Sequence, residues 1–321
     1  MTGKQGMTDS ISRADGLAAN IYAGGGLDRA SLWRSDDKWI LSQLDRPEAR
    51  LVPLSAGRVA IFRQGNGPVV AMPRAGDYRS WLRNGWPLHF LGLRDGSPLF
   101  VIDLPDDAAA PAVDGSDAQF TDLREVGAIL PHPDASLLAY ARALTHWHHT
   151  HRFCGRCGSP TESRQGGHMR QCLSADCAAQ HFPRTDPAVI MLVIAGDHCL
   201  LGRQARWRPG MFSALAGFVE PGESFEEAVA REVMEETGIP IRHLRYHSSQ
   251  PWPFPGNVMI GFHVSADRSP LRIDHNELET ADWFTRDDIR AFDRHGRSLP
   301  NADSIARRLV EDWVEGRIQA P

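Results

Sequence analysis

The clearest pattern of apolar and polar positions in this 321-residue chain runs over residues 225–237. At about 100° per residue, its apolar side chains fall on one stripe, as in a helix with one buried face. The stripe comprises Phe225, Ala228, Val229 and Val233. Ser224 and Glu227 have the spacing of a capping box, and Gly238 is a typical helix terminator. We therefore predict a helix over residues 225–237.

Three carboxylates fall on or beside this apolar stripe. They are Glu232, Glu235 and Glu236, and the opposite face is left to Glu226, Glu227, Ala230, Met234 and Thr237. An acidic run on a helix is usually a solvated face, but here the solvated face points elsewhere. Inward carboxylates are costly unless they are paired or bind a metal, and Arg231 alone cannot neutralise three. Because hard cations such as Mg²⁺ and Mn²⁺ take oxygen ligands, we predict a divalent-metal site on this helix edge.

Shorter apolar runs predict a β-rich N-terminal region. Residues 88–93 and 98–104 flank an Asp-Gly pair, which is typical of a hairpin turn, and residues 57–63 predict another strand. Residues 106–117 are rich in Ala, Pro, Gly and Asp, and they predict a linker or an exposed loop.

Further along the chain, the pattern predicts two helices and a pair of strands. Residues 134–150 have apolar positions at helical spacing, with Asp134 as the expected cap. The run 187–204 predicts a buried strand, a Gly-Asp turn and a second strand, in which Cys199 is expected in the core. A last helix is expected to begin after Ser304.

The other four cysteines form two close pairs, Cys154-x2-Cys157 and Cys172-x4-Cys177, separated by 14 residues. This spacing predicts a zinc ribbon in which four thiolates hold one structural Zn²⁺. Two alternatives are four unrelated buried cysteines and a catalytic zinc. Four nearby histidines are rival ligands: His146, His148, His149 and His151.

Length and charge set broad limits on the function. A chain of 321 residues favours two or three domains, and a net charge of −5 gives no chain-wide basic footprint for nucleic acid. The N-terminus has no apolar run typical of a signal peptide, and no stretch approaches the ~18 apolar residues of a membrane span. We expect a soluble cytoplasmic protein.

Residues 217–239 resemble the Nudix box. Gly217, Glu223 and the run REVMEETGI at 231–239 match all nine fixed positions of that motif. The resemblance implies hydrolysis of a diphosphate linked to a nucleoside. It also implies an α/β/α sandwich with a mixed sheet, in which Gly217, Glu223, Arg231 and Gly238 orient the box.

The stretch SQPWPFPGN, residues 249–257, narrows the substrate class. Its alternating prolines hold Trp252 and Phe254 on a stiff backbone, which favours stacking on flat rings, although packing into a core or dimer seam is the alternative. The stretch is similar to the SQPWPFPxS motif of NADH pyrophosphatases, a Nudix group that also carries a four-cysteine ribbon. Asn257 stands where that group has a serine. The resemblance covers roughly residues 130–315.

This resemblance implies cleavage of NAD(H) to nicotinamide mononucleotide and AMP, with removal of NAD caps from RNA by related enzymes. Two or three Mg²⁺ or Mn²⁺ ions would be held by Glu232, Glu235, Glu236 and Glu277, and Glu220 is a further acidic candidate. The general base stays open among Glu235, Glu236 and Glu277. The implied substrate contacts are Phe218, Gln250, Trp252, Phe254, Asn257 and Ala306, and a homodimer is implied as well.

The expected fold class is α+β or α/β, a Nudix sandwich preceded by a zinc ribbon and a β-rich domain. The predicted parts are a flexible leader (1–20), an N-terminal β-rich domain (21–130), a linking helix (131–151), the zinc ribbon (152–182) and the Nudix catalytic domain (183–321). Two other functions fit the sequence. One is a Nudix hydrolase for ADP-ribose, FAD or a dinucleoside polyphosphate, and the other is an inactive zinc-ribbon RNA-binding protein.

Overall fold

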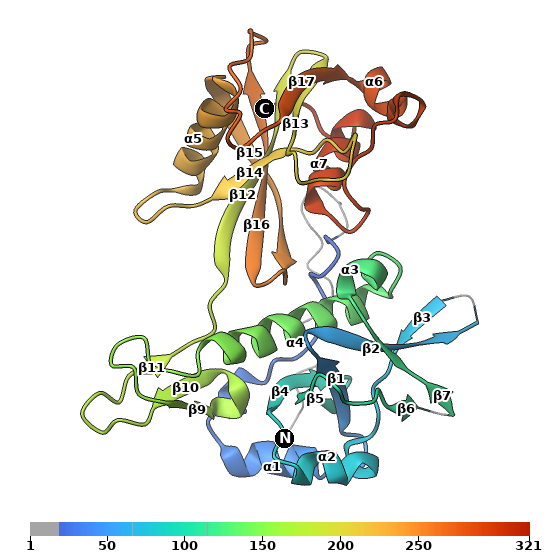
Figure 1. Ribbon diagram of the computed structural model, residues 1–321, viewed down its shortest axis with the longest axis vertical. Helices are drawn as coiled ribbons and strands as arrows, with labels where there is room; N and C mark the ends of the chain where they lie inside the picture. The colour runs from blue at the N-terminus through green and yellow to red at the C-terminus, as the bar shows by residue number, and fades with distance from the viewer. Residues whose placement is uncertain (1–18, 66, 114) are drawn as a thin grey trace, which may run out of the picture. The chain divides into compact units, whose positions relative to one another are not determined.

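The structure is a computed structural model that describes residues 19–65, 67–113 and 115–321 (Figure 1). The chain divides into two compact units: the residues up to Thr185 together with Trp252–Gly256, and Asp186–Pro251 together with Asn257–Pro321. The predicted leader, residues 1–20, lies outside the described residues except for its last two. The other predicted domain boundaries stay predictions.

The first unit is built on a mixed sheet with the strand order β3-β2-β1-β5-β4, and β8 also pairs with β2. The strands are β1 (Arg50–Ser55), β2 (Arg58–Gln64), β3 (Gly67–Val70), β4 (Leu88–Arg94), β5 (Ser97–Leu104) and β8 (Gln119–Thr121). Strands β1 and β5 run parallel, and the remaining pairs are antiparallel. The predicted hairpin is confirmed, with Asp95 and Gly96 both at positive φ in its turn.

Helices cover both faces of this sheet because its buried side chains alternate. Val52 and Leu54 pack with the long helix α4 (His132–Thr150), whereas Leu51 packs with α1 (Asp37–Leu44) and α2 (Arg79–Arg83). The shorter elements are η1 (Ser31–Trp33), η2 (Ala75–Tyr78), β6 (Ala112–Val113), β7 (Ser116–Asp117) and α3 (Leu123–Val126). The strands β6 and β7 lie within the segment predicted as a loop or linker.

The predicted start of α4 was wrong by two residues. The helix begins at His132 after Pro131, and a proline at N2 suits a first turn that needs no backbone donor there. Asp134 lies inside that turn and does not cap it. Instead its carboxylate accepts a hydrogen bond from Arg94 at 2.5 Å.

The ribbon is a small antiparallel sheet in the first unit, with the order β11-β10-β9. It consists of β9 (Thr161–Arg164), η3 (Gln165–Gly167), β10 (Met169–Cys172) and β11 (Gln180–His181).

The second unit is an α/β/α sandwich on a mixed sheet with the order β15-β16-β12-β13-β17, and β14 pairs with β12. The strands are β12 (Asp186–Ala195), β13 (His198–Arg203), β14 (Leu215–Phe218), β15 (Ile241–Trp252), β16 (Asn257–Ala266) and β17 (Thr280–Thr285). Strands β12 and β16 are parallel over nine residue pairs. The expected fold class is therefore confirmed.

Successive side chains of β12 point to opposite faces of the sheet, and this explains the layers of the sandwich. Val189, Met191 and Val193 belong to the core under α5 (Phe225–Thr237), while Ile190 and Leu192 belong to the core under α7 (Ile305–Val314). Figure 1 shows α5 on one side of the sheet, and α6 (Arg286–Arg290) and α7 on the other. A short η4 (Phe292–His295) follows α6. The predicted core position of Cys199 is confirmed, because its side chain is fully buried.

Helix α5 occupies the predicted span, with both hydrogen bonds of the capping box and Gly238 in the left-handed conformation at its end. Two predicted orientations were wrong. Phe225 is 41% exposed because it stands at the first helical position, beyond the edge of the core. Thr237 is buried, and its hydroxyl donates to the carbonyl of Val233 at 2.7 Å. That local bond removes the cost of burying a hydroxyl.

No helix in the described part of the chain has the length and hydropathy needed to cross a membrane.

Candidate active site

Three carboxylates converge beside the C-terminal half of α5. Oxygens of Glu232, Glu236 and Glu277 all lie within 4.8 Å of one another. Glu232 and Glu236 are one helical turn apart on α5, whereas Glu277 lies in the loop between β16 and β17. The sequence therefore placed the helical pair on the buried side of the helix correctly, and the structure brings the distant Glu277 to it.

Backbone hydrogen bonds hold the Glu277 loop against the end of α5. The amide of Asp274 donates to the carbonyl of Glu236 at 3.1 Å, and the amide of Arg272 donates to the carbonyl of Thr237 at 2.9 Å. The carbonyl of Asp274 in turn accepts a hydrogen bond from the amide of Glu277 at 3.2 Å. The loop thus uses carbonyls that the end of a helix leaves free, and this fixes where Glu277 stands.

Glu236 is a buried carboxyl in an unfavourable environment. Only 2% of the residue is exposed, and its Oε2 has no hydrogen-bond partner among the described residues. Burial, followed by the charges of Glu232 and Glu277, raises the pKa of Glu236 to about 8. Burial also raises the pKa of Glu232. An orphaned buried oxygen among three like charges fits a bound divalent cation, which would neutralise them.

Arg231 organises the acidic side of the site. Its guanidinium donates to Glu223 at 2.6 Å, to Glu232 at 2.8 Å and to Glu235 at 3.0 Å. It also donates to the carbonyl of Phe218 at 3.0 Å, so it ties α5 to the end of β14. The bonds from Arg231 lower the pKa of Glu223 to about 2. Arg231 fixes the positions of the carboxylates around it.

Gly217 allows the Glu232 carboxylate to lie against β14. A Cβ at this position would stand 1.9 Å from both Cδ and Oε1 of Glu232, so the carboxylate would have to shift. Any larger residue would therefore displace Glu232 from the cluster.

Glu235 lies outside the three-carboxylate cluster. Its side chain is 58% exposed, and its contact at the site is with Arg231. Glu220, the further acidic candidate, is also exposed.

The residues predicted to contact substrate differ in accessibility. Phe218, at the end of β14, is 57% exposed. Ala306 is buried on α7. Gln250 is fully buried, where it donates to the carbonyl of Asp303 at 2.6 Å and accepts from the amide of Ile305 at 2.8 Å. The amide of Gln250 therefore holds the start of α7.

Trp252 and Phe254 pack within the first unit. Phe254 is 9% exposed in the core beneath α4, and Arg124 stacks over its ring at 4.1 Å. Trp252 is half-buried and meets Tyr22 edge-on, with ring centroids 6.1 Å apart. For Phe254, the packing alternative describes this structure better than a free stacking face. Asn257, half-buried, opens β16.

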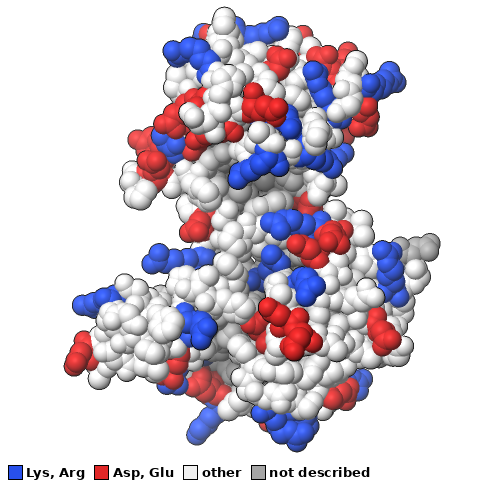
Figure 2. Space-filling model, in the orientation of Figure 1, with Lys and Arg blue, Asp and Glu red and all other residues white. Residues whose placement is uncertain are grey.

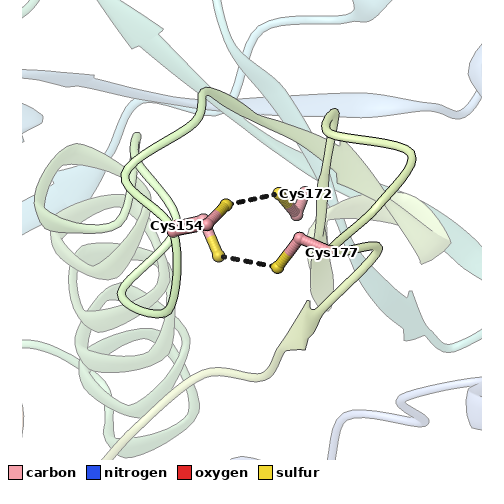
Figure 3. Close-up of side chains that lie close together, drawn as sticks. Cys154, Cys172 and Cys177 are labelled. Carbon is pink, nitrogen blue, oxygen red and sulfur yellow. Dashed lines mark hydrogen bonds between the residues drawn. The ribbon is translucent and has the colours of Figure 1, made fainter.

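The four cysteine sulfurs form a second cluster, and no disulfide links them. Figure 3 shows the side chains of Cys154, Cys172 and Cys177 turned toward a common centre. The sulfurs of Cys154 and Cys177 are 3.8 Å apart, and those of Cys157 and Cys172 are 3.5 Å apart. Four sulfurs at about 2.3 Å from a tetrahedral zinc would be about 3.8 Å apart. The geometry fits a closed zinc site.

The four rival histidines lie outside the sulfur cluster. His148 bonds the carbonyl of Gly167 at 2.8 Å, His149 pairs with Asp103, and none of the four joins the sulfur cluster. The histidine beside the cluster is His181, whose Nε2 lies 3.2 Å from the sulfur of Cys154. Sequence reasoning missed it, although it lies only four residues after Cys177.

Three known domain families match successive segments of this chain. A NUDIX domain matches residues 184–307, an NADH pyrophosphatase zinc ribbon domain matches residues 149–182, and an NADH pyrophosphatase-like rudimentary NUDIX domain matches residues 48–147.

Several named proteins are similar to this chain. NAD-capped RNA hydrolase NudC of Stutzerimonas stutzeri (strain A1501) is 41% identical over 231 residues, which cover 72% of this chain and 79% of the relative. NAD-capped RNA hydrolase NudC of Mycobacterium bovis (strain BCG / Pasteur 1173P2) is 44% identical over 208 residues, 61% of this chain and 66% of the relative. NAD-capped RNA hydrolase NUDT12 of Homo sapiens is 42% identical over 197 residues, 58% of this chain. The chain spans 43% of the length of that relative.

Proposed function

Because this chain belongs to the Nudix family, in the group that joins a NUDIX domain to an NADH pyrophosphatase zinc ribbon, we propose that it hydrolyses the pyrophosphate of NAD(H). The products would be nicotinamide mononucleotide, oxidised or reduced, and AMP. NAD caps at RNA 5′ ends are the second proposed substrate, in line with the names of the relatives.

The observation that carries this proposal is the cluster of Glu232, Glu236 and Glu277. A buried, unpartnered carboxyl oxygen has no structural purpose in a stable core, and its cost has to be offset by a ligand. A diphosphate brings further negative charge to the same place. Divalent cations held by these carboxylates would meet both needs, because they would neutralise the carboxylates and the diphosphate.

We assign Glu232, Glu236 and Glu277 as ligands of Mg²⁺ or Mn²⁺, with Glu235 at the edge of that site. When bound, such ions polarise phosphoryl oxygens and lower the pKa of a coordinated water. Glu235 is our candidate for the proton acceptor, because its exposed carboxylate lies outside the ligand cluster and Arg231 holds it in place. Glu223 and Arg231 position these groups without touching the reacting atoms.

We assign substrate stacking to Phe218, the exposed aromatic beside Gly217. Gln250 and Ala306 would act by shaping the start of α7, because the Gln250 amide is already bonded to backbone there. Trp252 and Asn257 stay proposed substrate contacts. The four cysteines would hold one structural Zn²⁺, with His181 hydrogen-bonded to a zinc thiolate. We further propose that the chain is a cytoplasmic homodimer.

A substrate panel tests the proposal. The purified chain is incubated with NADH, NAD⁺, NAD-capped RNA, ADP-ribose, FAD and a dinucleoside polyphosphate, each with Mg²⁺ or Mn²⁺, and products are separated by chromatography. We expect mononucleotide and AMP from NADH, and no turnover when the divalent cations are omitted. Faster cleavage of ADP-ribose or FAD than of every NAD substrate would contradict the assignment.

A further inference from the structure

The two faces of the zinc ribbon carry different side chains. Phe153 lies in an isolated bridge and Leu173 directly follows β10. Because neighbouring residues of an extended chain point to opposite faces, both lie on the face opposite to Cys154 and Cys172. The pairing agrees with this assignment, because Phe153 forms a bridge with Pro160, and the amide of Leu173 donates to the carbonyl of Pro160 at 3.0 Å. These residues form one row across the sheet.

Phe182 directly follows β11 and belongs to the same face by the same alternation. It follows His181, which lies on the cysteine side next to the sulfur of Cys154. Phe153, Leu173 and Phe182 are 61%, 56% and 55% exposed. We call these three side chains the outer ribbon face. Two exposed phenyl rings and a leucine in one small ribbon make this face a candidate contact surface for a ligand.

Positive charge is concentrated in the ribbon segment. Residues 149–185 contain five arginines against two acidic residues, in a chain whose net charge is −5. Arg164 pairs with Glu162, whereas Arg152, Arg156 and Arg184 are exposed and form no ion pair with a described residue. Figure 2 shows blue side chains and some red ones among white ones over the lobe that carries β9–β11 in Figure 1.

We propose that the outer ribbon face binds single-stranded RNA, the part of a capped transcript that follows the cap. Flat aromatic side chains on an exposed sheet stack on unpaired bases, and neighbouring arginines neutralise the phosphates. Unpaired arginines disfavour an apolar protein partner, because they would have to be desolvated there. This inference rests on the proposed function for its substrate, since free NAD(H) has no chain to reach such a face.

If so, variants of the outer ribbon face should affect NAD-capped RNA and free NADH differently, although both are cleaved at one active site. Contacts outside the reacting group add binding energy only for a substrate that carries RNA. Loss of the outer ribbon face should therefore raise KM for NAD-capped RNA and leave the turnover of free NADH unchanged.

The direct test is binding of a fluorescent single-stranded oligoribonucleotide of roughly ten nucleotides with a 5′ monophosphate, followed by anisotropy. The double variant Phe153→Ala/Phe182→Ala should raise its Kd about tenfold or more, because each stacked base contributes a factor of this order. The variant Arg156→Gln/Arg184→Gln should weaken binding and reduce the slope of log K against log salt by about 1.4, because each phosphate contact on a single strand contributes about 0.7. Controls are Leu32→Ala, at an 89% exposed position of the same unit, and Arg79→Gln/Arg83→Gln.

Zinc content and NADH turnover are measured on every variant to exclude misfolding. The proposal is overturned if the wild-type chain does not bind the oligonucleotide, if the ribbon variants bind it like the controls, or if NADH turnover falls with RNA affinity. It is also overturned if the variants change only the oligomeric state, which would make this face a contact between copies of the chain. The binding arm needs no catalysis, so it separates failure of this inference from failure of the proposed function.

Discussion

The sulfur cluster of the ribbon and the carboxylate cluster of α5 are both suited to metal, but they differ in completeness. The four sulfurs can fill all four coordination positions of a tetrahedral ion without any outside ligand, and Cys154 and Cys172 are buried. The three carboxylates instead leave coordination positions open, and Glu277 is exposed. A closed ligand set serves folding, whereas an open one leaves room for water and substrate.

The two sites also differ in what holds the ligands. The cysteines lie on the loops and strand ends of a small sheet with little core of its own, so that sheet depends on the metal. The glutamates lie on a capped helix that is packed against a complete sheet, so their fold does not depend on the metal. Removing one ligand should therefore damage stability at the first site and activity at the second.

The largest effect is expected for Cys172→Ser. It should reduce bound zinc from one ion per chain to nearly none and lower the unfolding temperature, because zinc binding contributes roughly 10–16 kcal/mol in isolated zinc peptides. Metal analysis and thermal unfolding measure both effects. The matched control is Cys199→Ala in the core of the second unit, which should keep its zinc. Unchanged zinc in Cys172→Ser would show that the four sulfurs are not the ligands.

The next largest effect is expected for Glu236→Gln. Replacing a residue that only hydrogen-bonds to a metal ligand typically costs about 10–100-fold in activity, so loss of a ligand itself should lower kcat/KM for NADH by about a hundredfold or more. The variant should fold normally, because glutamine preserves the shape of the side chain and has no charge to bury. The control is Glu226→Gln, an exposed position on the same helix. Wild-type turnover in Glu236→Gln would rule out this residue as a ligand.

Local signals made α5 and the sulfur cluster predictable from the sequence. The capping box, Gly238 and the cysteine spacing act over a few residues, and α5 has the predicted bounds. By contrast, Glu277 reaches the site through backbone bonds between distant segments, and no local pattern encodes them; only a family resemblance indicated it. The burial of Phe254 likewise depends on tertiary packing with Arg124, which the stiff proline-rich stretch does not reveal.

A smaller effect is expected for Gly217→Ala. The new Cβ would overlap the Glu232 carboxylate, so Glu232 has to move out of the cluster and weaken metal binding. We expect kcat/KM to fall about 10- to 100-fold at limiting Mg²⁺, with part of the loss recovered at high Mg²⁺. Steady-state rates over a Mg²⁺ titration measure this. Gly76→Ala is the control, since a Cβ there meets nothing within 4 Å. An unchanged Mg²⁺ dependence would remove Gly217 from the site.

The smallest effect concerns pH, in protein that keeps its zinc but lacks Mg²⁺ and Mn²⁺. The folded-state pKa of Glu236 is raised to about 8 from an ordinary value of 4.5, so between these pH values the folded state binds the proton more tightly than the unfolded state. The free energy of unfolding should then fall as pH rises through this window, by at most roughly 1.4 kcal/mol per pH unit. Urea unfolding at several pH values measures it. Glu236→Gln should lose this decline, and Mg²⁺ should offset it in the wild type, because the cation replaces the proton among the carboxylates. The same decline in the variant would mean that another group causes it, and the contrast between a self-sufficient sulfur site and a charge-strained carboxylate site would fail.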